Sequence, residues 1–180
     1  GINLLPDADP TVANQMQSAI QAWRQPGDAV IASLHWGANW VSEIPDAHRA
    51  LARRLIDLGA VDVIHGHSSH HVLPCEVYRG KPVLYGCGDL INDTEGIPEY
   101  RARSGHLGAL YFVDLDTETL CVRNLRARPI ERPLLLADAA GSDVGMRQMG
   151  CLRQPRPSCP SLANPHGRRR LHDIEPTVVR

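Results

Sequence analysis

Residues 28–65 constrain the fold more strongly than any other part of the sequence, because a helical pattern lies there between two apolar runs of strand length. Residues 28–35 (DAVIASLH) are mostly apolar, as in a parallel strand that is covered on both faces. Residues 45–58 place alanine and leucine on one helical face, and Gly59 suits the C-terminal cap. Residues 61–64 form a second short apolar run. The segment therefore predicts a right-handed βαβ unit and an α/β fold.

Weaker patterns flank this unit on both sides. Residues 10–24 place apolar side chains at helical spacing, which predicts an amphipathic helix before the first strand. After the second strand the apolar period changes to two. We expect hairpins within 75–85 and 107–125, each with a short polar or glycine-containing turn.

The C-terminal part of the sequence lacks any sustained period. Residues 151–180 contain five prolines and six arginines, a composition that buries too little apolar surface to become ordered. We therefore expect one domain at 1–137 and an irregular, disordered tail at 138–180.

Composition argues against several classes of partner. Apolar residues make up 43% of the chain and the formal net charge is -1, so no charge field of one sign favours a nucleic acid or a membrane surface. The apolar runs are too short for a transmembrane segment. The five cysteines form no C-x-x-C pair, which favours reduced thiols and a cytoplasmic location. Membrane association or export stays open if a signal segment precedes Gly1.

A dense group of histidines follows the second strand. The stretch IHGHSSHHV holds four of the nine histidines in the chain: His65, His67, His70 and His71. His35 ends the first strand. Ligands of open α/β sheets bind beyond the carboxyl ends of the strands, so we expect His35 and the cluster to share one cleft. Imidazoles at this density favour metal ligation over a hydrogen-bonded polar loop.

Other candidate residues have more than one interpretation. His65 lies within the strand, and we expect it to point away from the side of His67 as a supporting or core residue. His71 has three possible roles: a third metal ligand, a contact to phosphate, or a side chain that only packs in the hairpin. Asp89 is a carboxylate ligand, a partner that orients a histidine, or the start of an Asx-turn.

Three stretches resemble the bacterial CapA family of capsule or poly-gamma-glutamate synthesis proteins: LHWG at 34–37, LIDLGAVDVIHGHSSHH at 55–71 and EVYRGKPVLYGCGDL at 76–90. The resemblance covers about 28–126. It implies kinship with calcineurin-like metallophosphoesterases and hence a four-layer αββα sandwich that holds two divalent metal ions, Mn, Fe or Zn. The chain resembles the C-terminal portion of such a protein.

The resemblance also implies roles for individual residues. His35 matches the histidine of the His-Trp-Gly motif, and His67 and His70 match those of the Gly-His-x-x-His motif. Asp89 falls where many relatives carry Asn, so the implied metal ligands are His35, His67, His70 and Asp89. His71 is extra to the motif and is the candidate catalytic general acid. No residue is assigned to another cofactor.

Two functions follow as expectations. The first is a metal-dependent phosphoesterase-type hydrolase of capsule or poly-gamma-glutamate biosynthesis, with an anionic polymer or phosphoester as substrate. The second is a non-catalytic assembly or binding protein for a polyanionic capsule polymer. Residues 1–27 lack the Asp, Gly-Asp and Asn series that completes the superfamily's metal site. We therefore expect this chain to bind metal weakly and to turn over little.

Overall fold

The computed structural model describes residues 3–6, 8–91, 107–131, 138–139 and 177–179. These residues form a six-stranded sheet, in the order β1-β9-β2-β3-β5-β4, and a three-stranded sheet, in the order β6-β7-β8. The strands of the larger sheet are β1 (Asn3–Leu5), β2 (Ile31–His35), β3 (Val63–His67), β4 (Cys75–Tyr78), β5 (Lys81–Leu84) and β9 (Thr177–Val179). The smaller sheet consists of β6 (Leu107–Leu115), β7 (Val122–Glu131) and β8 (Asp138–Ala139), and the helices are α1 (Val12–Gln21) and α2 (Asp46–Asp57).

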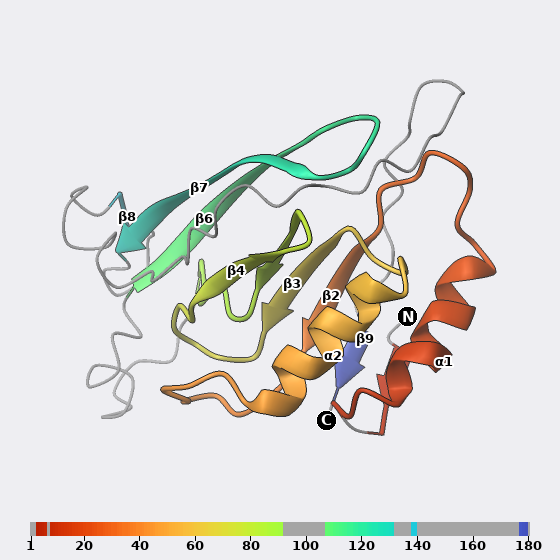
Figure 1. The fold of residues 1–180 in the computed structure, drawn as a ribbon. Helices are drawn as coiled ribbons and strands as arrows, with labels where there is room; N and C mark the ends of the chain where they lie inside the picture. The colour runs from red at the N-terminus through yellow and green to blue at the C-terminus, as the bar shows by residue number, and fades with distance from the viewer. Residues whose placement is uncertain (1–2, 7, 92–106, 132–137, 140–176, 180) are drawn as a thin grey trace.

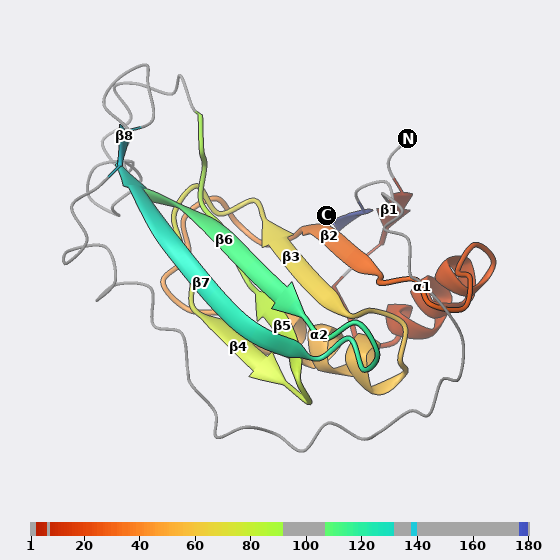
Figure 2. The same cartoon turned by 90° about the horizontal axis from the view of Figure 1, so that it is seen from above.

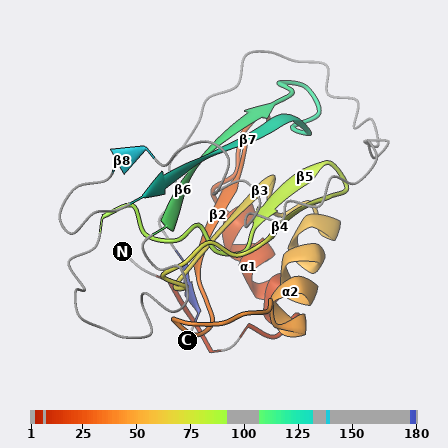
Figure 3. The ribbon, with the colours of Figure 1, turned by 90° about the vertical axis from the view of Figure 1, so that its left-hand side faces the viewer.

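The described elements form three layers. Helices α1 and α2 cover one face of the larger sheet, and the long hairpin of β6 and β7 lies over the opposite face (Figures 1 and 3). Seen from above, this hairpin lies over β5, with β3 visible beside it (Figure 2). The larger sheet is mostly parallel, and only β4 and β5 pair antiparallel. This arrangement confirms the mixed α/β class, whereas the fourth layer of an αββα sandwich stays a prediction.

The predicted βαβ unit is present, because β2 and β3 pair in parallel on either side of α2 in the sequence. The two strands alternate between a helix-facing and a hairpin-facing side. Leu34 and Ile64 are fully buried in the core that includes Leu51 and Leu55 of α2. The hairpin-facing positions carry the polar residues of both strands. One face of this unit therefore stabilises the fold, and the other is available for a site.

A network of buried charges holds the opposite end of the sheet, where β3 begins. The carboxylate of Asp62 accepts hydrogen bonds from Arg24 at 2.9 Å, from Lys81 at 2.8 Å and from the backbone N–H of Val30 at 3.0 Å. The Lys81 ammonium also donates to the carbonyl of Leu120, at the turn between β6 and β7. Asp62 thus connects the segment after α1 with the starts of β2 and β5, and through Lys81 with the second sheet.

Two expectations about the chain need correction or stay open. Cys75 and Cys121 are disulfide-bonded and Cys87 is a buried free thiol, so the prediction of reduced cysteines is wrong for the first two. Sequence spacing alone does not reveal such pairing.

Within the predicted tail, the structure describes only β8 and β9. Disorder of the remaining tail residues lies outside the described part and stays a prediction. No described helix is long and apolar enough to span a membrane.

Candidate functional site

Two histidines lie side by side where β2 and β3 end. The parallel register pairs His35 with His67, and the centroids of their rings are 5.1 Å apart in an edge-to-face arrangement. Side chains alternate between the two faces of a strand, and this alternation places both histidines on the face toward the β6–β7 hairpin. The strand ends therefore bring together two of the histidines that the sequence indicated as candidate metal ligands.

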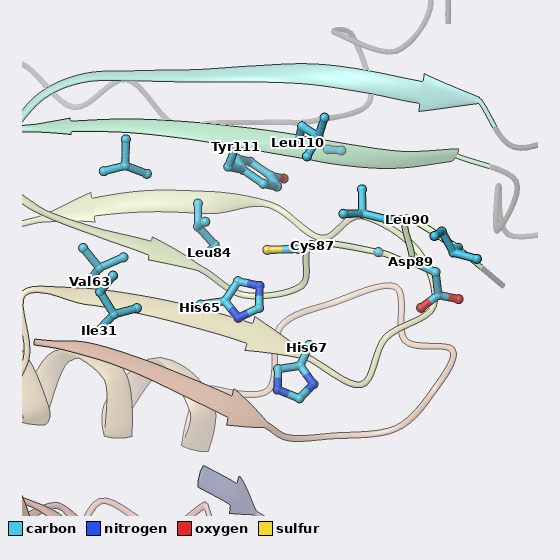
Figure 4. Close-up of a pocket in the computed structure, with 14 residues that line it drawn as sticks. Ile31, Val63, His65, His67, Leu84, Cys87, Asp89, Leu90, Leu110 and Tyr111 are labelled. Carbon is cyan, nitrogen blue, oxygen red and sulfur yellow. The ribbon is translucent and has the colours of Figure 1, made fainter. Parts of the chain in front are cut away.

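His65 extends this pair along the strand. Its ring centroid lies 5.6 Å from that of His67, and its Nδ1 is hydrogen-bonded to Ser33 Oγ at 3.0 Å. Both side chains line the same cavity, and Figure 4 shows His65 along β3 and His67 at the end of that strand. The expectation that His65 points away from His67 is wrong, because residues two apart in a strand share a face. Ser33 was missed by the sequence analysis, although the same rule places it beside His35.

These histidines are held in the neutral form. Burial, followed by the proximity of His65 and His35, lowers the pKa of His67 from 6.5 to about 4. Burial also lowers the pKa of His65. Neutral imidazole has a free nitrogen lone pair, which is the form that binds a metal ion. His67 is therefore chemically suited to ligation near neutral pH.

His70 and Asp89 form a second group on the loops. His70 Nδ1 lies 2.9 Å from Asp89 Oδ2, in a hydrogen bond that the carboxylate accepts. This is the orienting contact that the sequence left open for Asp89. His71 Nδ1 lies 3.3 Å from the carbonyl of Val72. Among the residues that the structure describes, no group of three or more His, Cys, Asp or Glu could hold a metal ion. The roles of His35, His67, His70, His71 and Asp89 stay predictions.

A buried aromatic residue fixes the loops that carry these side chains. The indole N–H of Trp36 donates to the carbonyl of Tyr85 at 2.9 Å, and its ring stacks on His48 with centroids 4.8 Å apart. The indole passes over Gly66, where an added Cβ would lie 2.5 Å from Trp36 Nε1. The glycine before His67 therefore gives space to the tryptophan after His35. Nothing in the sequence indicated a role for His48, because the residue is one polar position among others in the predicted helix.

A cavity of about 640 Å³ lies between the two sheets, next to the histidines. His65 and His67 line it from β3 and Tyr111 from β6, and Asp89 contributes from the loop beyond β5 (Figure 4). Much of the remaining lining is aliphatic, from Ile31, Val63, Leu84, Leu90 and Val113. The polar strand ends thus border an apolar space.

Together, the fold and the site define a class: a mixed α/β protein with histidines gathered at the carboxyl ends of two adjacent parallel strands. The family model for the bacterial capsule synthesis protein PGA_cap matches residues 3–94, about half of the chain. The chain belongs to this family.

Curated relatives support the assignment. A probable polyglutamine synthesis accessory protein of Mycobacterium tuberculosis is 42% identical over 131 residues, which cover 72% of this chain and 34% of that protein. The PGA biosynthesis protein CapA of Bacillus subtilis is 36% identical over 86 residues, or 48% of this chain and 22% of that protein. The chain thus spans about a third of the length of the first relative.

Proposed function

We propose that this chain is the part of a CapA-like protein that carries histidines of a metal-dependent phosphoesterase-type site, in a protein that acts in capsule or polyglutamate synthesis. The observation that carries the proposal is the pair of His35 and His67 at adjacent strand ends, with ring centroids 5.1 Å apart. The names of the relatives, which refer to polyglutamine and PGA synthesis, support the biological setting.

The described residues fit part of a metal site. His67 offers a neutral imidazole beside the ring of His35, and His70 is oriented by Asp89 so that its Nε2 can face a ligand. Bound divalent cations would lower the pKa of a water molecule and neutralise phosphate oxygens. In this proposal His71, adjacent to His70, donates a proton to the leaving oxygen. Carboxylates that offset the charge of two cations must come from elsewhere in the protein.

The test compares two chains. The 180-residue chain and a longer chain that carries the N-terminal region of a relative are assayed for bound Mn, Fe and Zn and for turnover of bis(p-nitrophenyl) phosphate. We expect little of either from the shorter chain and a sharp rise in the longer one. The gain should vanish with His67→Ala or His70→Ala and persist with His172→Ala, a matched substitution in the predicted tail. Equal hydrolysis by the two chains would contradict the proposal of a partial site.

A second function is favoured by one observation, namely that the described residues contain no group of three metal ligands. In this alternative the protein binds a polyanionic capsule polymer without cleaving a phosphoester. It predicts that poly-gamma-glutamate binds in isothermal titration calorimetry while neither chain hydrolyses the phosphodiester. Hydrolysis that depends on His67 would exclude it.

A further inference from the structure

The loops that follow β2 and β3 are bonded to each other along their length. The N–H of Trp36 donates to the carbonyl of His67 at 3.0 Å, and the N–H of His70 donates to the carbonyl of Asn39 at 3.1 Å. Between these contacts, Ser68 Oγ donates to the carbonyl of Gly37 at 2.9 Å. The two loops therefore form one unit, and the first loop determines where the histidines of the second loop lie.

Trp40 lies in the first loop and contacts two histidines of the second. Its ring centroid is 5.3 Å from that of His70, and 6.0 Å from that of His71, whose plane is inclined by only 8°. The imidazole of His70 thus contacts both the Trp40 indole and the carboxylate of Asp89. The side chain of His70 nevertheless remains 35% exposed, so its ring is accessible to a ligand.

We propose that Trp40 is a positioning residue that fixes the ring orientations of His70 and His71. The terminal torsion of histidine is broad when nothing packs against the ring, so a loop histidine needs a neighbouring surface to keep one orientation. The indole supplies that surface to both residues. With Nδ1 of His70 directed to Asp89, the ring presents Nε2 to a ligand. The inference rests on the proposed function for the identity of that ligand, but the ring geometry can be measured without it.

The experiment compares Trp40→Leu and Trp40→Phe with Trp23→Leu, a matched control at a tryptophan that is 83% exposed. Long-range ¹H–¹⁵N NMR spectra report the imidazole rings of the 180-residue protein. We expect Trp40→Leu to shift the ring signals of His70 and His71 while those of His35 and His67 stay in place. Trp40→Phe should retain most of the original signals, because it keeps an aromatic surface. Trp23→Leu should change none of the four.

Calorimetric titration of Zn²⁺ into the longer chain, which carries the N-terminal region of a relative, supplies a second readout. Trp40→Leu should weaken binding about 10-fold to 100-fold, as loss of a residue that supports a metal ligand commonly does. Unchanged ring signals in Trp40→Leu would overturn the inference. The inference would also be overturned if both Trp40 variants lost the same thermal stability and the signals of all four histidines moved. That result would show that Trp40 supports the fold and does not orient particular rings. A longer chain that binds no Zn²⁺, although the ring shifts of the 180-residue protein appear as predicted, would contradict the proposed function alone.

Discussion

At the scale of single residues, Gly66 is a position in the candidate site where one added methyl group should matter strongly. A Cβ there would lie 2.5 Å from Trp36 Nε1 and 2.5 Å from the carbonyl oxygen of Tyr85, and backbone cannot move away cheaply. We expect Gly66→Ala to lower the free energy of unfolding by about 1–3 kcal/mol, as overpacking does. The near-ultraviolet signal of Trp36 should change with it. Urea denaturation and near-ultraviolet circular dichroism measure the two effects.

Gly59→Ala is the matched control for this substitution. Nothing lies within 4 Å of a Cβ at Gly59, although its φ of +64° carries the cost of left-handed backbone, about 1–2 kcal/mol. This variant should therefore lose stability without a change in the Trp36 spectrum. If both variants leave that spectrum unchanged, the indole does not pass over Gly66 as described.

The sequence predicted single residues unevenly. His35 and His67 could be placed together because each ends an apolar run, and parallel strands end at a common edge. Trp40 could not be selected, because its role depends on how two loops pack, and no period governs a loop. His65 was placed on the wrong side although the two-residue period of a strand determines it. The two-residue period was enough to place His65 on the side of His67, but it was applied wrongly.

At the scale of elements, the buried charge network around Asp62 should hold the strands together where β3 begins. The Asp62 side chain is 6% exposed and that of Lys81 is 15% exposed. Removing the carboxylate leaves the ammonium buried without its counter-charge. We expect Asp62→Ala to cost about 3–5 kcal/mol, with part of this loss recovered by Lys81→Met in the same chain. Urea unfolding of the two single variants and the double variant gives the coupling.

Asp57 provides the comparison, since it pairs with Arg79 at 3.0 Å on the surface. The Arg79 side chain is 59% exposed, so Asp57→Ala should cost no more than about 1 kcal/mol. Strictly additive effects of Asp62→Ala and Lys81→Met would show that the buried pair is not coupled.

The elements themselves were predictable to different degrees. Helix α2 was expected at 45–58 and spans Asp46–Asp57, because its apolar face and terminal glycine are both local signals. The β4–β5 and β6–β7 hairpins also followed from local period and turn residues. Strand β9 did not, because its pairing with β1 and β2 joins segments far apart in the sequence. Composition carries no information about such a contact.

At the scale of the whole molecule, the two ends of the sheet have different tasks. Histidines gather at the carboxyl ends of β2 and β3, whereas salt-bridged Asp62 lies just before β3 begins. Substitutions at the Asp62 end should therefore change stability, and those at the histidine end should chiefly change ligand binding. The site end nevertheless contributes to stability through pH, because burial lowers the pKa values of His65 and His67.

The stability of the folded protein should depend on pH through His48 and His67. Burial lowers the pKa of His48, and burial with neighbouring His65 and His35 lowers that of His67 to about 4. Below the unfolded value of about 6.5, the unfolded chain binds protons that the folded protein excludes. Stability should therefore be full above pH 6.5 and fall as the pH drops toward 4. After discounting for partial exposure, His67 accounts for about 1–2 kcal/mol of this loss.

Urea midpoints at pH 7, 5.5 and 4.5 measure the slope, with Trp fluorescence as the signal. His67→Gln should flatten it, because the amide does not titrate in this range. His48→Phe should flatten it as well while keeping a ring stacked on Trp36, whose centroid lies 4.8 Å from that of His48. Carboxylates such as Asp116, whose pKa is held low by hydrogen bonds from Thr119 and Arg123, contribute only at more acidic pH. A slope between pH 7 and 4.5 that both variants leave unchanged would show that these imidazoles take up protons in the folded protein.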